Sequence, residues 1–271
     1  MSGPLYEREL AAAVAIAHEA GALLKDNFGR EQEVGYKGRI NLVTEMDKRS
    51  EQLIITRLNE AFPGDDILAE EGGGSRSGSE RIWIVDPLDG TTNYAHEYPV
   101  WSVSIALQES GDLKVGVVYN PLLDDTYAAR RDGGAMLNRR PRRVSEVDDL
   151  GKAMLGTGFS YDLGGDNEAN NIGPFSRFLL SAQAVRRAGS AALAIAKVGV
   201  GRSDGFWERG LQPWDMAAGM LIVQEGGGKT SNYEGGPGGL TERKLVATNG
   251  RIHGAMLDVL QAVTSGDLRR E

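Results

Sequence analysis

The chain has 271 residues, 41% of them hydrophobic, which is enough for one large domain or two closely packed ones. Its formal net charge is −8, so no overall positive field attracts nucleic acid or an anionic membrane, and we expect neither as a partner. It contains no cysteine, which excludes disulfides, zinc–thiolate sites and thiol catalysis and favours a cytoplasmic protein.

The N-terminal stretch interleaves charged residues with alanines and lacks the basic-then-apolar pattern of a signal peptide. No run approaches the roughly 20 apolar residues of a spanning helix. Apolar residues at three- and four-residue spacings predict a first helix, and Thr44 is suited to cap a second, which ends before Pro63. We predict helices at 5–28 and 45–62, a polar loop at 35–41, strands at 67–71 and 81–86 joined by a glycine- and serine-rich loop, and an antiparallel meander over 101–138.

In the second half of the chain, the predicted strands and helices alternate along the sequence. Pro213 is suited to the first turn of a helix, and glycines follow that helix at its end. We predict a strand at 152–159, a helix at 167–181, a strand, glycine turn, helix and strand over 184–210, a helix at 213–227, a strand at 244–250 and a last helix at 251–264. The prediction is of two α+β halves, 1–150 and 151–271, that share an interface.

Several carboxylates stand at the ends of predicted elements. In the stretch WIVDPLDGTTNY, Asp86 and Asp89 follow a buried strand, Glu70 and Glu71 end the strand before it, and Asp215 lies in the first turn of a helix. Burying unpaired carboxylates is costly, and clustering them raises their pKa values by mutual repulsion. Hard divalent cations with oxygen ligands, Mg²⁺ above all, resolve both problems, whereas three scattered histidines argue against zinc. Either acidic pair alone is also common on solvated strand ends.

The turn after Asp89 offers donors for an anion. Gly90, Thr91 and Thr92 supply backbone N–H groups and hydroxyls of the kind that bind phosphate. The Thr91 hydroxyl, held by a carboxylate such as Asp47, could orient an attacking water, or it could only stabilise the turn. The pattern indicates a metal-bridged phosphate site and leaves both interpretations of Thr91 open.

Taken together, DPLDGTTN at 86–93, EE at 70–71, NLVTEMD ending at Asp47 and PWDMAAG at 213–219 resemble the inositol monophosphatase family. The similarity runs from the first helix to the last strand, in the family's order. It implies a five-layer αβαβα sandwich of the inositol monophosphatase and fructose-1,6-bisphosphatase type. It further implies a homodimer that hydrolyses phosphate monoesters with Mg²⁺ and is inhibited by Li⁺.

The resemblance also implies roles for individual residues. The metal would be held by Glu70, Asp86, the Leu88 carbonyl, Asp89 and Asp215, and the attacking water would be activated by Asp47, Glu70 and Thr91. Phosphate would bind to the N–H groups of Gly90 and Thr91. The alcohol side of the substrate would be lined by Gly189, Ser190, Ala191 and Glu208. Lys37 matches a loop lysine near the metals. Blander interpretations stand beside these: a strand-to-helix turn for Gly189–Ala191, a surface charge for Glu208, core packing for the four tryptophans, and a solvated hairpin for the basic run at 130–143.

The function expected is that of an inositol-1-monophosphatase acting on myo-inositol monophosphates. Related enzymes of this fold act on fructose 1,6-bisphosphate, 3′-phosphoadenosine 5′-phosphate or histidinol phosphate. The sequence DGTTN favours the inositol type, and Glu208 favours a leaving group rich in hydroxyls over a second phosphate, which it would repel. The alternative from another class is a regulatory binding protein of the transcription machinery that retains phosphatase activity.

Overall fold

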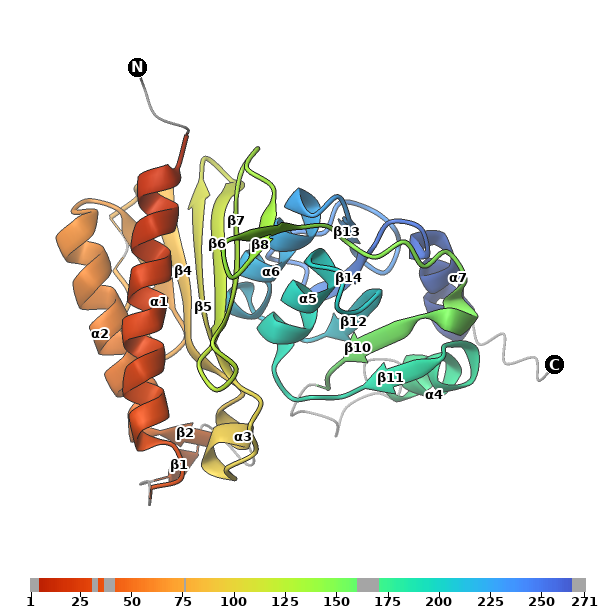
Figure 1. The fold of residues 1–271 in the computed structure, drawn as a ribbon, viewed down its shortest axis with the longest axis horizontal. Helices are drawn as coiled ribbons and strands as arrows, with labels where there is room; N and C mark the ends of the chain where they lie inside the picture. The colour runs from red at the N-terminus through yellow and green to blue at the C-terminus, as the bar shows by residue number, and fades with distance from the viewer. Residues whose placement is uncertain (1–4, 31–33, 37–41, 76, 160–170, 265–271) are drawn as a thin grey trace.

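The computed structural model describes residues 5–30, 34–36, 42–75, 77–159 and 171–264. These residues form five layers, seen from left to right in Figure 1. Helices α1 (Glu7–Asn27) and α2 (Glu45–Ala61) cover the outer face of a seven-stranded sheet, and α5 (Ala191–Gly199) and α6 (Pro213–Glu225) lie between that sheet and a five-stranded one. Helices α4 (Ile172–Ser181) and α7 (His253–Thr264) cover the far side. The αβαβα sandwich expected from the sequence is confirmed.

The seven-stranded sheet has the order β3-β4-β5-β6-β7-β8-β9. Its first pair, β3 with β4, is parallel, and the rest form the predicted antiparallel meander. The strands are β3 (Asp66–Ala69), β4 (Arg81–Asp89), β5 (Ser102–Glu109), β6 (Asp112–Asn120), β7 (Asp125–Arg130), β8 (Ala135–Leu137) and β9 (Arg140–Arg142).

The five-stranded sheet has the order β11-β10-β12-β14-β13 and mixes parallel with antiparallel pairs. Its strands are β10 (Met154–Thr157), β11 (Ala184–Arg186), β12 (Gly205–Arg209), β13 (Lys229–Ser231) and β14 (Lys244–Thr248). The division of the chain at residue 150 stays a prediction.

Close packing fixes α6 against the first sheet. A Cβ atom on Gly116 of β6 would lie 2.6 Å from the carbonyl oxygen of Ala218, so only glycine permits this approach of strand and helix. Both elements belong to a buried apolar cluster that joins the seven-stranded sheet, α5, α6 and the second sheet. The helix that carries Asp215 is therefore held directly on the sheet that carries Asp86 and Asp89.

Two predictions around Pro87 are wrong. Strand β4 does not end before this proline but continues to Asp89, because its register against β5 shifts between Asp86 and Asp89. A proline, which lacks an N–H donor, is tolerated at such an irregularity. The segment after Gly90 is a short helix, α3 (Thr91–Ala95), where the sequence predicted only a turn.

Other boundaries also differ. Part of the predicted polar loop pairs as a small antiparallel sheet of β1 (Val34–Tyr36) and β2 (Leu42–Thr44), and β3 ends before Glu70. In the described residues α4 begins at Ile172, five residues after the predicted start; residues 167–170 and Lys37 lie outside the described part of the chain. Strand β13 was not predicted. None of the helices described here combines the length and apolar character required to cross a membrane.

Candidate active site

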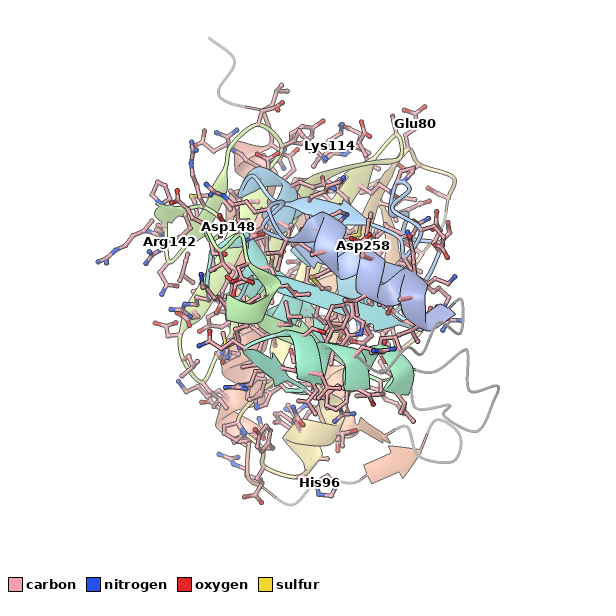
Figure 2. The ribbon with its side chains drawn as sticks, turned by 90° about the vertical axis from the view of Figure 1, so that its right-hand side faces the viewer. Glu80, His96, Lys114, Arg142, Asp148 and Asp258 are labelled. Carbon is pink, nitrogen blue, oxygen red and sulfur yellow. The ribbon has the colours of Figure 1, made fainter. Side chains whose placement is uncertain are left out.

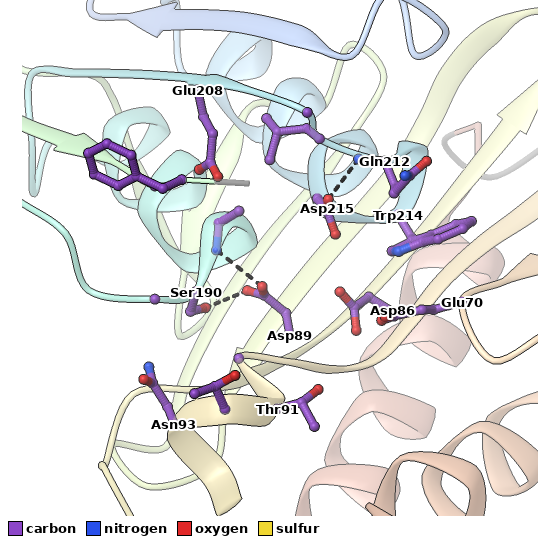
Figure 3. Close-up of a pocket in the computed structure, with 18 of the residues that line it drawn as sticks. Glu70, Asp86, Asp89, Thr91, Asn93, Ser190, Glu208, Gln212, Trp214 and Asp215 are labelled. Carbon is purple, nitrogen blue, oxygen red and sulfur yellow. Dashed lines mark hydrogen bonds between the residues drawn. The ribbon is translucent and has the colours of Figure 1, made fainter. Parts of the chain in front are cut away.

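A cavity of about 400 Å³ opens where the two sheets meet α3, α5 and α6 (Figure 3). Its walls come from segments that are far apart in the sequence: the end of β4, the turn into α5, the end of β12 and the start of α6. Of the twelve predicted site residues, eleven line it: Glu70, Asp86, Leu88, Asp89, Gly90, Thr91, Gly189, Ser190, Ala191, Glu208 and Asp215. Asp47 stands behind this wall and reaches it through Thr91.

The first turns of two helices place two of the carboxylates. Asp47 and Asp215 are each the third residue of a helix, α2 and α6, and each turns one oxygen back to the N–H of the residue that caps its helix. Asp47 Oδ2 accepts from Thr44 N at 2.7 Å, and Asp215 Oδ2 accepts from Gln212 N at 2.7 Å. This capping arrangement fixes each carboxylate and leaves its other oxygen directed elsewhere. The predicted cap at Thr44 and the predicted place of Pro213 in the first turn of α6 are confirmed.

The second carboxylate oxygen of Asp47, Oδ1, holds Thr91. The Thr91 hydroxyl lies 2.8 Å from Asp47 Oδ1 and 3.1 Å from the Leu88 carbonyl oxygen. A hydroxyl has one proton, so these two acceptors compete for it and the oxygen's lone pairs remain available toward the pocket. Asp47 is 1% exposed, which makes this a buried and directional contact. The contact expected between the Thr91 hydroxyl and the Asp47 carboxylate is therefore present.

Asp89 joins the two halves of the site. Both of its oxygens accept hydrogen bonds from the start of α5: Ala191 N lies 3.1 Å from Oδ1, Ala192 N lies 3.0 Å from Oδ2, and the Ser190 hydroxyl also donates to Oδ2. Ser102 adds a fourth donor at 3.1 Å. The first N–H groups of a helix have no partner within it, so Asp89 acts as an external cap for α5. Strand β4 and helix α5 are fastened together at this carboxylate.

Four of the carboxylates that face the pocket repel one another. Burial raises the pKa of Asp86 well above its usual value, and the charges of Glu70, Asp89 and Asp215 raise it further. Burial is also the main reason why the pKa of Asp215 is raised, to about 8, with Asp89 and Glu70 adding to it. Figure 3 shows Glu70, Asp86, Asp89 and Asp215 facing the same space. Four acidic groups that face one space disfavour one another's charged forms, and a divalent ion would relieve this repulsion.

The donor set fits a hard cation in chemistry and charge, since it offers only carboxylate and carbonyl oxygens. In the part of the chain that the structure describes, however, no three acidic or histidine side chains already stand in positions to hold one metal ion. To hold a divalent ion, the side chains of Glu70, Asp86, Asp89 and Asp215 would therefore have to move, with the Leu88 carbonyl as a further ligand. Substrate and water oxygens would complete its ligands.

Glu208 lies on β12 and is 8% exposed. Burial raises its pKa well above the usual value, and the charges of Asp215 and Asp89 contribute, while Arg187 acts in the opposite direction. Its side chain faces the pocket across from Asp89 (Figure 3). The interpretation of Glu208 as a plain surface charge is wrong. Trp83, Trp101 and Trp207 are fully buried, as predicted, but Trp214 is half-buried and lines the pocket.

Several contributors were not predicted. Asn93 donates to the carbonyl oxygens of Val100 at 2.6 Å and Ala188 at 2.8 Å, which ties α3 to the turn before α5. Arg187 and Arg243 add positive charge to the pocket wall, and Ser102 supports Asp89. The asparagine stands inside the DGTTN motif and was visible there, but no local pattern marks two arginines and a serine from separate strands and loops as neighbours.

Comparison with known proteins agrees with this fold and site. The model of the inositol monophosphatase family matches residues 5–265. The chain is 44% identical to an inositol-1-monophosphatase of Synechocystis over 94% of its length and 88% of that protein. It is 40% identical to the Nus factor SuhB of Pseudomonas aeruginosa over 95% of its length and 97% of that protein.

Solved structures of similar fold include proteins of the same kind as these relatives. The extragenic suppressor protein SuhB of Bartonella henselae superposes with a TM-score of 0.89 at 36% identity, covering 93% of this chain and 98% of that one. An inositol monophosphatase of Anabaena (Nostoc) gives 0.85 at 40% identity, with 93% and 95% covered. A layered α+β sandwich with a carboxylate-lined pocket thus defines a phosphatase-type fold. The chain belongs to the inositol monophosphatase family.

Proposed function

We propose that this protein is a Mg²⁺-dependent phosphate monoester hydrolase, an inositol-1-monophosphatase that acts on myo-inositol monophosphates. The observation that carries the proposal is the convergence of Glu70, Asp86, Asp89 and Asp215 on one pocket beside the hydrogen-bonded pair of Thr91 and Asp47. A bound divalent ion would neutralise substrate phosphate and lower the pKa of a water.

The chain's own residues would position the reactants. The N–H groups of Gly90 and Thr91, at the start of α3, would bind phosphate oxygens. The Thr91 hydroxyl, oriented by Asp47, would accept a hydrogen bond from the attacking water, and Glu70, which also lines the pocket, would assist. Proton transfer toward the Thr91–Asp47 pair would accompany attack of the water oxygen on phosphorus. The ester P–O bond would break, and the departing oxygen would take up a proton from solvent and leave as the alcohol toward α5 and β12.

The substrate's alcohol half would lie against Gly189, Ser190, Ala191 and Glu208. The Glu208 carboxylate would accept hydrogen bonds from sugar hydroxyls, and it disfavours a second phosphate at that place. The test is a panel of phosphate monoesters with Mg²⁺, comparing kcat/KM for inositol monophosphate, fructose 1,6-bisphosphate, 3′-phosphoadenosine 5′-phosphate and histidinol phosphate. A preference for any of the last three would reject the inositol assignment.

Other parts of the proposal rest on the family. Inhibition by Li⁺, assembly as a homodimer and a cytoplasmic location stay predictions. Support for the dimer comes from α4, where Ile172, Leu179 and Leu180 are 51%, 57% and 84% exposed beside the edge strand β11. Large apolar side chains grouped on one helix are typical of a surface that a partner covers.

A regulatory role is the second candidate, because relatives in Pseudomonas aeruginosa and Escherichia coli are named Nus factor SuhB at 40% and 38% identity. The variant Asp89→Asn separates the two functions. Loss of hydrolysis together with an unchanged cellular phenotype would support a binding role that needs no catalysis.

A further inference from the structure

One basic surface is not explained by hydrolysis. The β8–β9 hairpin carries Arg139, Arg140, Arg142 and Arg143, and all four are exposed. Within the described residues none of these guanidinium groups forms a hydrogen bond or an ion pair. Arg142 projects from the edge of the molecule in Figure 2. The four charges stand together in a protein whose formal net charge is −8, so they form a local field opposite in sign to that of the whole.

The turn of this hairpin holds an arginine in a backbone conformation that glycine adopts more easily. Asn138 and Arg139, the two residues between β8 and β9, have φ values of 52° and 62°. Positive φ at both residues is the signature of a type I′ turn, which normally takes Asn-Gly. Here the second position, suited to glycine, is Arg139. A side chain held in this strained backbone region is an observation that points to a function for the side chain.

The hairpin presents the arginines from a fixed scaffold. The Asn138 side chain accepts from Thr126 N at 2.7 Å and donates to Asp125 at 3.1 Å, so the turn is fastened to β7. After the hairpin, Val144 N donates to the Gly226 carbonyl oxygen at 3.1 Å. Arg140 and Arg142 share one face of β9, about 7 Å apart at the usual strand rise.

The residue types indicate what this surface binds. All four cations are arginine, whose planar guanidinium makes paired hydrogen bonds to phosphate. The stretch 135–143 has no aromatic residue on which a single-stranded base could stack. Leu137 and Ala135 are buried and Met136 packs against the core, so the hairpin presents little apolar surface to a membrane beyond Pro141. Pro141 removes one N–H from the edge strand, which weakens pairing with a peptide strand.

We propose that the hairpin formed by Arg139, Arg140, Arg142 and Arg143 is a docking surface for the phosphate backbone of double-helical nucleic acid. This proposal departs from the expectation, drawn from the net charge, that nucleic acid is no partner, because the local charge of the hairpin is opposite in sign to that of the whole chain. Binding should be weak and independent of base sequence, because phosphate contacts position a protein without reading bases.

The test is fluorescence anisotropy of the full chain with 20-base-pair RNA and DNA duplexes at several salt concentrations. Four neutralised phosphates predict a slope of log K against log salt of about −3.6 on DNA, and so roughly a hundredfold weaker binding at 200 mM than at 50 mM salt. The variant Arg140→Gln/Arg142→Gln should halve the slope. The control Arg49→Gln/Arg251→Gln, which removes two exposed arginines elsewhere, should leave it nearly unchanged.

Arg139→Gly removes one of the charges by a substitution that suits the backbone conformation of the turn. Glycine relieves the strained turn, so we expect the melting temperature to rise by about 2–4 °C while duplex binding falls. Phosphatase activity should be unchanged in every hairpin variant, since none of these residues lines the pocket. Absence of binding at 50 mM salt, an equal loss in the control, or tighter binding to poly-glutamate, single strands or anionic vesicles than to duplexes would overturn the proposal. The relative affinities for RNA and DNA duplexes identify the source of the phosphates.

Discussion

Removing the Thr91 hydroxyl tests whether its contact with Asp47 serves catalysis. In Thr91→Ala the 2.8 Å hydrogen bond to Asp47 Oδ1 is lost, while Oδ2 keeps its two donors, the Thr44 N–H and hydroxyl. A hydrogen bond to a charged group contributes about 1.5–3 kcal/mol, so we expect a loss of about 2 kcal/mol in the free energy of unfolding. For a chain of this size that is a fall in melting temperature of roughly 4–8 °C.

The expected loss of activity is larger. A group that orients and helps deprotonate the attacking water contributes about 10²–10⁴-fold, so kcat/KM should fall at least a hundredfold. Thr91→Ser keeps the hydroxyl and should restore most of the activity. Asp47→Asn keeps an oxygen for the Thr44 N–H but places an amide donor toward Thr91, so the hydroxyl proton must turn to the Leu88 carbonyl.

The assay is kcat/KM for inositol monophosphate with saturating Mg²⁺, together with thermal unfolding of each variant. Asp47→Asn should lose activity with a smaller loss of stability than a variant that removes the side chain. If Thr91→Ala loses the expected stability but hydrolyses substrate at the wild-type rate, the hydroxyl only stabilises the start of α3 and the assignment is wrong.

The remaining predictions concern charge, substrate and assembly. Asp86→Asn and Asp215→Asn should each lower kcat/KM by about a hundredfold or more; wild-type rates in folded variants would reject their place as ligands. Because the pKa of Asp215 is raised to about 8, its contribution to stability in metal-free protein is present at low pH and lost as pH rises toward 8. The melting temperature of metal-free protein should therefore fall between pH 5 and pH 9, and Mg²⁺ should raise it more at pH 8 than at pH 5; an equal effect at both would contradict this account. Glu208→Gln should weaken kcat/KM for inositol phosphate about tenfold and leave a simple aryl phosphate nearly unaffected, whereas equal losses would mean that Glu208 maintains the site without reading substrate. Leu179→Ser/Leu180→Ser should shift a dimer to monomer in sedimentation at micromolar concentration, and an unchanged mass would place any interface elsewhere.

Local patterns in the sequence determined many of the secondary-structure elements of this protein and pointed to its carboxylate pocket. Apolar periodicity defined α1 and the meander, and the caps at Thr44 and Pro213 fixed where α2 and α6 begin, because a helix start depends on a few adjacent residues. The acidic motifs predicted a shared pocket, since each carboxylate stands at or near the end of an element. Local signals could not predict the continuation of β4 through Pro87, because that depends on pairing with β5.

Only the tertiary structure decided how the carboxylates are held. Asp89 caps α5 from about a hundred residues away in sequence, and Arg187 and Arg243 reach the pocket from two separate loops. The tertiary structure also decided the conformation of the basic run at 130–143. Its composition predicts only a solvated hairpin, whereas the positive φ of Arg139 and the hydrogen bond between Thr126 N and the Asn138 side chain exist only in the folded chain. Contacts between distant residues arise from packing of whole layers, and that packing energy is not encoded in any short stretch of sequence.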